Sequence, residues 1–311
     1  MPSPARPSLA HRLADRLLYD VARPLAASMS PRAFDRLARA LAVPAALPML
    51  AVSPAQTTAY LRQVGHPDGL GRLRFAYRKA LARLRGEWVY LRPDTPVRRG
   101  PGLRAFEARG EPAVVVGWSG YHMIGAAALA AERDDRVIRF PYGSEGGPGP
   151  DAVAEPWQRW EAHQAAVRHR LIGPLQLLPG RSPLAYLRAL REGRSLIVMQ
   201  DVPVPGADIR TLLGVERPLP VGAVRLAAAG RVGLYTISVT FRDGELWADL
   251  DGPHTGDEQA LLDQLAGHIR AEPWAWTLWR EFLLDPVPEP APVASASPGP
   301  AFRLTDPAPT G

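Results

Sequence analysis

The sequence predicts an α/β protein with a mixed, largely parallel sheet that is flanked by helices and preceded by an N-terminal helical segment. Apolar residues recur at helical spacing through much of the first 95 residues. From Pro112 onward, short runs rich in β-branched residues alternate with helix-period segments, as in layered α/β folds. The turn Arg242-Asp243-Gly244 joins two such runs, and Asp-Gly favours a tight hairpin. The sheet is therefore expected to be mixed.

The chain divides into three parts. Residues 1–95 form the N-terminal helical segment, residues 96–284 the α/β domain, and residues 285–311 a tail rich in Pro and Ala. The tail has few apolar side chains to offset the entropy cost of ordering, so we expect it to be disordered.

The helical segment should contain helices over residues 9–25, 31–41, 57–64 and 71–91. The last of these has the clearest apolar stripe, with arginines on its other faces: Leu73, Tyr77, Leu81, Leu84, Trp88 and Leu91. It should be a long amphipathic helix.

The α/β domain should alternate strands with helices. Strands are expected over residues 113–118, 136–140, 175–178, 195–200, 232–241 and 245–250. Helices are expected over residues 121–132, 156–170, 183–191, 219–229 and 257–271. The segments 142–151 and 202–216 are rich in Gly and Pro and follow strand ends, where open α/β sheets bind their ligands, and we predict them as loops.

The composition is that of a folded protein with a basic surface. Of 311 residues, 46% are hydrophobic, which is ample for a core and excludes disorder of the whole chain. The net charge of +6 favours anionic partners, although the abundance of Arg, with Lys79 the only lysine, also fits a GC-rich genome. The absence of Cys excludes disulfides, thiolate metal sites and a Cys nucleophile.

No transmembrane helix is expected. Residues 40–52 are the most apolar window, but they are too few to span a bilayer and include Pro44 and Pro48. Near the N-terminus, four apolar residues recur at helical spacing among charges: Leu9, Leu13, Leu17 and Val21. This stripe differs from a signal peptide and favours a helix that lies on anionic lipid. We expect a cytoplasmic protein, peripheral on the inner face of the cell membrane.

One run after the first predicted strand of the α/β domain carries the main functional signal: Val116, Gly117, Trp118, Ser119, Gly120, Tyr121, His122 and Met123. It resembles the catalytic motif of the lysophospholipid acyltransferase superfamily, and of its lipid A biosynthesis (lauroyl/myristoyl) acyltransferases in particular. In that family a His is followed, after four residues, by Asp or Glu. Trp118 stands at the His position and Met123 at the acid position, so the motif here is degenerate.

Further segments resemble the same family in matching order across residues 70 to 283. These are Arg139-Phe140-Pro141, Arg170-Leu171-Ile172-Gly173, residues 187–193 with the strand ending in Asp201, residues 219–227, and residues 273–282 with their Trp, Arg and Phe. The resemblance implies a glycerolipid acyltransferase-like fold. It also implies transfer of a fatty acyl group from acyl-CoA or acyl carrier protein, as cosubstrate, to a lipid or glycolipid hydroxyl, with no other cofactor.

The resemblance implies that a base removes the hydroxyl proton and that an acid orients the base. His122 is the candidate base and Asp201 the candidate replacement for the missing acid. Candidate substrate-binding residues are Trp118, Gly120, Tyr121, Arg139, Arg168 and Arg170, the arginines because guanidinium groups pair with phosphate. We expect peripheral contact with an anionic lipid or glycolipid surface.

Structural interpretations of the same residues stay open. His122 also fits a surface or helix-capping role, Trp118 a core position, and Asp201 a cap on the loop that follows it. Each Arg also fits a solvated surface charge. Because the His and the acid are missing, a catalytically silent superfamily member that binds lipid or a partner is the alternative function.

Other classes of site lack support in the sequence. The histidines are scattered, so no metal site is expected. Residues 117–120 depart from the G-x-S-x-G pattern of a nucleophile elbow, and residues 143–149 lack the ending of a P-loop. The Arg-rich helix over residues 72–92 lacks the interleaved aromatics of a nucleic-acid-binding module, so we expect no nucleic acid partner.

Overall fold

The computed structural model describes residues 20–21, 23–51, 54–66, 71–92, 95–121, 126, 162–164, 166–167, 170, 183–203, 207–220, 222–242 and 244–278. The predicted elements over residues 136–140 and 175–178, most of those over 121–132 and 156–170, the loop over 142–151 and the tail over 285–311 lie outside these ranges.

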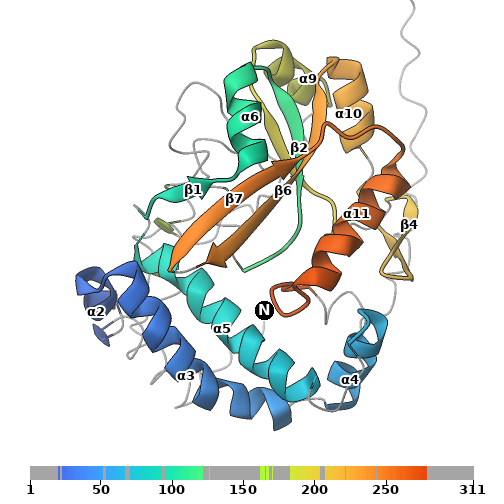
Figure 1. Cartoon of the computed structure of the whole chain (residues 1–311). Helices are drawn as coiled ribbons and strands as arrows, with labels where there is room; N and C mark the ends of the chain where they lie inside the picture. Colours follow the sequence, from blue (N-terminus) through green and yellow to red (C-terminus); the bar gives the residue numbers. More distant parts are fainter. Residues whose placement is uncertain are drawn as a thin grey trace, which may run out of the picture.

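The described N-terminal part is helical. Its helices are α2 (Arg23–Ser28), α3 (Pro31–Ala51), α4 (Pro54–Gln63) and α5 (Gly71–Leu91). The bounds of α5 are those that its apolar stripe predicts. Helix α3 continues beyond the predicted end at residue 41, and it buries Ala38, Ala42 and Ala46 one turn apart. These small side chains let α3 lie closely along α5, as Figure 1 shows.

A five-stranded sheet follows in the order β1-β7-β6-β2-β3. Its strands are β1 (Val97–Arg99), β2 (Ala113–Gly117), β3 (Leu196–Met199), β6 (Gly233–Arg242) and β7 (Glu245–Asp251). The pairs β1–β7, β6–β2 and β2–β3 are parallel, and only the β6–β7 hairpin is antiparallel. The predicted fold class, a mixed and largely parallel sheet flanked by helices, is confirmed.

The remaining described elements are α6 (Pro101–Arg109), α9 (Pro183–Arg191), β4 (Ile209–Leu212), β5 (Val215–Pro218), α10 (Ala223–Gly230) and α11 (Glu258–Ala271). The sequence patterns did not predict α6, although Pro101 at its first position and Gly110 in the left-handed region at its end are typical helix limits. Strand β1 was missed as well, because two of its three residues are Arg.

The predicted loop over residues 202–216 is partly wrong. Its second half belongs to the hairpin β4–β5. Leu213 and Gly214 form the two-residue turn, with φ angles of 54° and 77°. Two positive φ angles are typical of a tight hairpin turn, but a Leu gives no sequence signal for one. Helix α10 also begins later than predicted, at Ala223 instead of residue 219.

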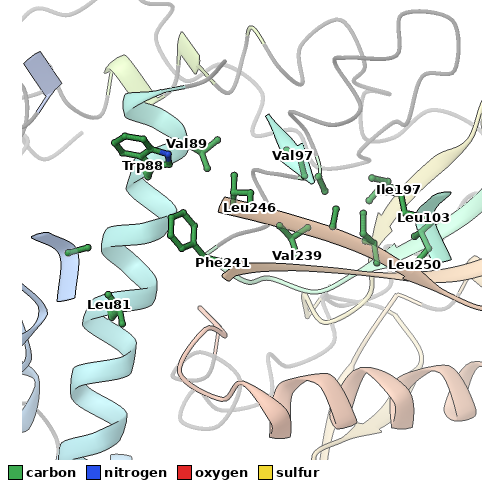
Figure 2. Close-up of a cluster of buried hydrophobic side chains, with 14 of the residues drawn as sticks. Leu81, Trp88, Val89, Val97, Leu103, Ile197, Val239, Phe241, Leu246 and Leu250 are labelled. Atoms are coloured by element: carbon green, nitrogen blue, oxygen red, sulfur yellow. The ribbon is translucent and has the colours of Figure 1, made fainter. Parts of the chain in front are cut away.

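The sheet is covered on both faces, and alternate residues of its central strands enter two different cores. Ala113, Val115 and Ile197 belong to one buried cluster. Val114, Val116 and Leu196 belong to the other, with residues of α10 and α11. Figure 2 shows the first cluster, where Leu81 and Trp88 of α5 lie beside Phe241 at the end of β6. Continuous apolar strands are the consequence of burial on two faces.

The first turn of α6 packs so closely on β7 that glycine is required there. The Cβ of an alanine at Gly102 would overlap the backbone oxygen of Leu250, and Leu103 N donates a hydrogen bond of 3.0 Å to Asp249. We expect Gly102→Ala to lower the free energy of unfolding by about 1–3 kcal/mol, because backbone must shift to admit the methyl group. Chemical denaturation measures this value.

Gly267 of α11 provides the matched control. It is exposed, and an added Cβ meets no atom within 4 Å. Gly267→Ala should raise the free energy of unfolding by about 0.5–1 kcal/mol, since alanine is the better helix former. Similar effects of the two substitutions would contradict the packing argument.

Candidate functional site

The candidate site lies beyond the carboxyl ends of β2 and β3. The two strands run parallel and in register, with Gly117 beside Met199. The residues that follow β2, from Trp118 to Tyr121, therefore leave the sheet at the same edge as Gln200 and Asp201. We call this edge the strand-end rim. Open α/β sheets bind ligands at such an edge.

Asp201 is fully buried at the rim and is held by neutral donors. Its Oδ2 accepts hydrogen bonds from the backbone N–H of Ser119 at 2.6 Å and from Trp276 Nε1 at 2.8 Å. Its Oδ1 accepts one from Ser119 Oγ at 3.1 Å. Burial raises the pKa of Asp201, and the hydrogen bonds from Ser119 and Trp276 counteract part of this increase. The carboxyl group ties β3 to the run after β2.

The chain after α11 completes this arrangement. The backbone N–H and Oγ1 of Thr277 each donate a hydrogen bond of 2.8 Å to Ser119 O. Gly120 forms an antiparallel bridge with Trp276, and Tyr121 N donates to Ala275 O at 3.1 Å. Residues 119–121 are therefore fixed between a buried carboxyl group and a second backbone segment.

Helix α5 closes one side of the run. A Cβ at Gly86 would lie 2.7 Å from Tyr121 O, so only a glycine lets the helix approach this closely. Two turns earlier on the same face of α5, the Lys79 ammonium lies 5.7 Å from the centre of the Tyr121 ring. The N-terminal helical part thus contributes to the rim.

Trp118 is a buried wall of the rim. Its side chain is 4% exposed and belongs to the second core cluster. A Cβ at Gly120 would lie 3.2 Å from the Trp118 ring, so this glycine leaves room for the indole. Within the described residues, Trp118 Nε1 has no hydrogen-bond acceptor. An indole donates but does not accept protons, so Trp118 is unable to act as a base.

A largely apolar cavity of about 430 Å³ opens beside the end of β3. Met199, Gln200, Tyr186 and Leu226 are among the residues that line it. Gln200 donates from Nε2 to Glu258 at 3.1 Å, and within the described residues its buried Oε1 has no donor. Besides Gln200, the charged residues Asp208 and Arg225 also line this cavity.

The structure describes only some of the site residues that the sequence predicts. His122, Arg139 and Arg168 lie outside the described residues. Arg170 is exposed. Trp118, Gly120, Tyr121 and Asp201 come together at the rim through the contacts above.

The sequence patterns gave no role to two residues that shape the rim. Trp276 was noted only as part of a family-like ending, and Gly86 only as a position within a helix. Their contacts with Asp201 and Tyr121 join residues far apart in the chain, which no local pattern encodes. Among the described residues, no group of three or more His, Cys, Asp or Glu side chains is arranged to hold a metal ion.

Comparisons with known proteins give similarity to solved structures but no match to a family model or to a curated protein. The crystal structure of the 1-acyl-sn-glycerophosphate (LPA) acyltransferase PlsC from Thermotoga maritima is similar over 78% of this chain and 99% of its own. The identity is 13% and the TM-score is 0.32.

Proposed function

We propose that the protein is an acyltransferase that moves a fatty acyl group from acyl-CoA or acyl carrier protein to a lipid or glycolipid hydroxyl. The observation that carries the proposal is the family-like run 116–123, whose described residues 116–121 lie where parallel strands end, together with the family-like segments that follow it in matching order. The apolar cavity beside β3 supports it, because its size and lining suit part of an acyl chain.

The proposed reaction needs a base, a thioester and an acceptor hydroxyl. The hydroxyl oxygen attacks the thioester carbonyl, the C–O ester bond forms, and the C–S bond breaks. The base takes the hydroxyl proton, which then passes to the departing thiolate. We assign the base to His122, which follows the fixed run 119–121 directly.

Asp201 is proposed as a positioning residue for this base. Its oxygens are occupied by Ser119 and Trp276, so it acts through the run that precedes His122. Arg139, Arg168 and Arg170 are proposed to contact phosphate groups of the acceptor or of the donor's carrier arm.

The second candidate function is a catalytically silent member of the superfamily that binds lipid or a partner. Two observations favour it. Trp118 stands where the family has its His and is buried in the core, and Met123 stands where the family has its acid. Neither side chain exchanges protons.

One assay separates the two functions. Purified protein is incubated with acyl-CoA and a panel of lysophospholipids and glycolipids, and free thiol and acylated lipid are measured. The proposed enzyme releases thiol and forms acylated lipid in equal amounts. Binding of lipid without thiol release would support the silent member and contradict the enzyme.

We further propose that the protein binds the inner face of the cell membrane peripherally. No helix among the described residues is long and apolar enough to cross a bilayer. Helix α3 exposes the apolar side chains of Leu41, Val43 and Leu47, of which Leu47 is 63% exposed. Val43 and Leu47 lie one turn apart on the same side of α3, and this pair suits shallow insertion into lipid, with the exposed Arg36 two turns earlier on that side drawn to anionic headgroups.

Sedimentation with anionic vesicles tests the membrane proposal. Binding should weaken with salt, because surface charges are screened within about 10 Å at 0.1 M. Leu47→Gln should reduce binding, whereas the control Leu184→Gln, at another exposed apolar residue on α9, should not. Absence of vesicle binding, or retention in membranes after high-salt and carbonate washes, would contradict peripheral association.

A further inference from the structure

A second cavity, of about 550 Å³, lies between α3, α5, the end of β6 and the segment after α11. Half of the residues that line it are charged, a larger share than in the cavity beside β3. Arginines come from three separate elements: Arg39 on α3, Arg78 and Arg85 on α5, and Arg242 at the end of β6. Glu272 is the acidic residue in its lining. We call this space the arginine cavity.

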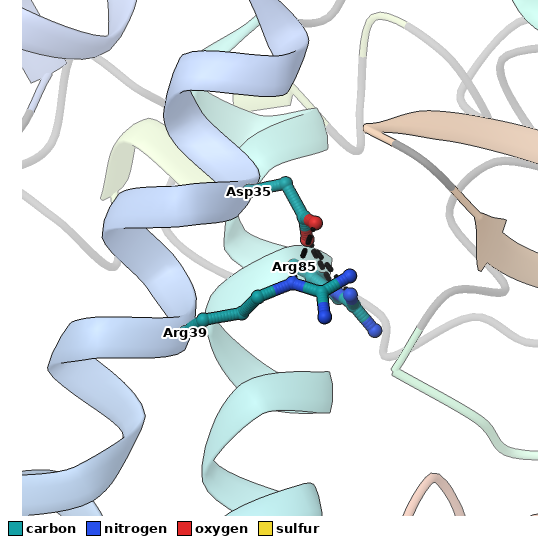
Figure 3. A network of polar contacts seen from close by, with 3 residues as sticks. All are labelled: Asp35, Arg39 and Arg85. Atoms are coloured by element: carbon teal, nitrogen blue, oxygen red, sulfur yellow. Dashed lines mark hydrogen bonds and ion pairs between the residues drawn. The ribbon is translucent and has the colours of Figure 1, made fainter.

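One buried carboxylate organises two of these arginines, as Figure 3 shows. Asp35 Oδ1 accepts from Arg85 Nε at 2.9 Å and from Arg85 Nη2 at 2.7 Å. Asp35 Oδ2 accepts from Arg39 Nε at 2.9 Å. A single negative charge therefore fixes two guanidinium groups and leaves one positive charge in excess.

The other two arginines are placed by different contacts. The Arg78 guanidinium carbon lies 4.2 Å from the centre of the Trp274 ring, which holds the guanidinium plane against the aromatic face. Arg242 and Arg78 are both exposed. The charges of Arg242, Arg85 and Arg78 act on Glu272 and lower its pKa, but burial outweighs them and raises it.

The charge balance favours an anion with two negative charges. Among the groups described above, the four guanidinium groups of the cavity are set against two carboxylates, that of Glu272 in the lining and that of Asp35, which binds Arg39 and Arg85; this set carries two more positive charges than negative ones. Guanidinium groups bind phosphate oxygens with directional, charge-assisted hydrogen bonds, and a phosphate presents oxygens toward several donors at once. A carboxylate ligand would neutralise only half of the excess.

We propose that the arginine cavity is a binding site for a phosphate group, either a lipid phosphate headgroup or a free phosphate. The cavity has room for a phosphate with a glycerol-sized substituent. The inference does not depend on acyl transfer, because it rests on the arginines of α3, α5 and β6 and on no residue of the proposed reaction.

Isothermal titration calorimetry of the full chain tests the proposal with two probes, inorganic phosphate and monomeric dihexanoyl phosphatidic acid. We expect saturable binding at one site. A headgroup site should bind phosphatidic acid at least about tenfold more tightly than inorganic phosphate, whereas a free-phosphate site should reverse this order or show equal affinities.

Substitutions that remove a positive charge and one that removes a negative charge locate the binding site, because they should change the affinity in opposite directions. Arg242→Gln and Arg78→Gln should each weaken binding about tenfold or more, through loss of a charge-assisted hydrogen bond. Glu272→Gln should strengthen binding, because it removes a competing negative charge. Both arginines are exposed, so their variants should keep the melting temperature of the parent.

Arg191→Gln is the matched control, because it makes the same change of net charge at the exposed end of α9. It should leave binding unchanged. The proposal is overturned if neither probe binds saturably, if Arg242→Gln and Arg78→Gln bind like the parent, or if Arg191→Gln weakens binding as much as they do.

Discussion

Replacing His122 with Ala is expected to lower acyl-transfer turnover by about 10²- to 10⁴-fold, the usual contribution of general acid–base catalysis. The argument is by elimination. Trp118 and Met123 at the family's positions do not exchange protons, and the chain has no Cys. His122 directly follows Tyr121, whose backbone is fixed by Ala275 and by the close approach of α5 at Gly86. Steady-state kinetics measure the turnover, and a melting curve measures the melting temperature.

The melting temperature of His122→Ala should stay near that of the parent, so that lost turnover reports chemistry. His66→Ala is the control, since His66 is exposed and its ring contacts only the backbone of Arg270 among the contacts described for it. Equal turnover in the parent and in His122→Ala would show that the base lies elsewhere.

A converse variant combines Trp118→His with Met123→Glu and restores the family's spacing. It should raise or create activity if the groove is otherwise intact. Because the Trp118 ring is buried against Gly120, the substitution also leaves a void, so its melting temperature should fall. An inactive parent with an active double variant would establish the silent-member reading and contradict the proposed enzyme.

Asp201→Ala is expected to lower the free energy of unfolding by about 3 kcal/mol or more. The substitution leaves the Ser119 N–H and the Trp276 indole N–H without their acceptor in the interior, and each buried unsatisfied donor costs about 1–3 kcal/mol. Chemical denaturation measures the change. Asp263→Ala, at an exposed carboxylate of α11, is the control and should stay within about 0.5 kcal/mol of the parent. A loss as small as the control's would contradict the anchoring role of Asp201.

Asp201→Asn should reveal the ionisation of the buried carboxyl group. The folded pKa of Asp201 is raised above its unfolded value, so the folded state binds the proton more tightly. Its contribution to stability is fully present below the unfolded pKa and is lost as the pH rises from there through the folded pKa. Asn does not ionise, so the Asp201→Asn variant does not lose this stability as the pH rises.

The stability of Asp201→Asn relative to the parent should therefore increase as the pH rises through this interval. Denaturation curves of both proteins at a series of pH values give the difference directly. A difference that is constant with pH would show that the folded and unfolded pKa values coincide, against the expected effect of burial.

The sequence predicted the elements of the fold correctly where burial imposes a regular spacing of apolar residues. The apolar stripe of α5 predicted both of its ends, and the apolar run over residues 113–118 predicted the strand β2, which the structure buries on both faces. Prediction failed where side chains carry little periodicity. Strand β1 is short and basic, and the β4–β5 turn depends on a Leu with positive φ.

The candidate site was predictable only in part. The run after β2 was singled out by its resemblance to a family motif, and Asp201 was expected beside it because the carboxyl ends of parallel strands meet at one edge. The hydrogen bond from Trp276 Nε1 to Asp201 and the contact of Gly86 with Tyr121 were not predicted, because each joins segments that are distant in the chain.

The sequence alone determined the class of fold and the residues of the run after the first predicted strand of the α/β domain, with Trp118 and Met123 in it. These features are local, because they depend on periodicity, turn chemistry and residue identity. Only the tertiary structure decided that Asp201 is a buried anchor and that arginines of α3, α5 and β6 surround one cavity. Burial and charge balance depend on which distant side chains share a space, and that is fixed when the helices pack on the sheet.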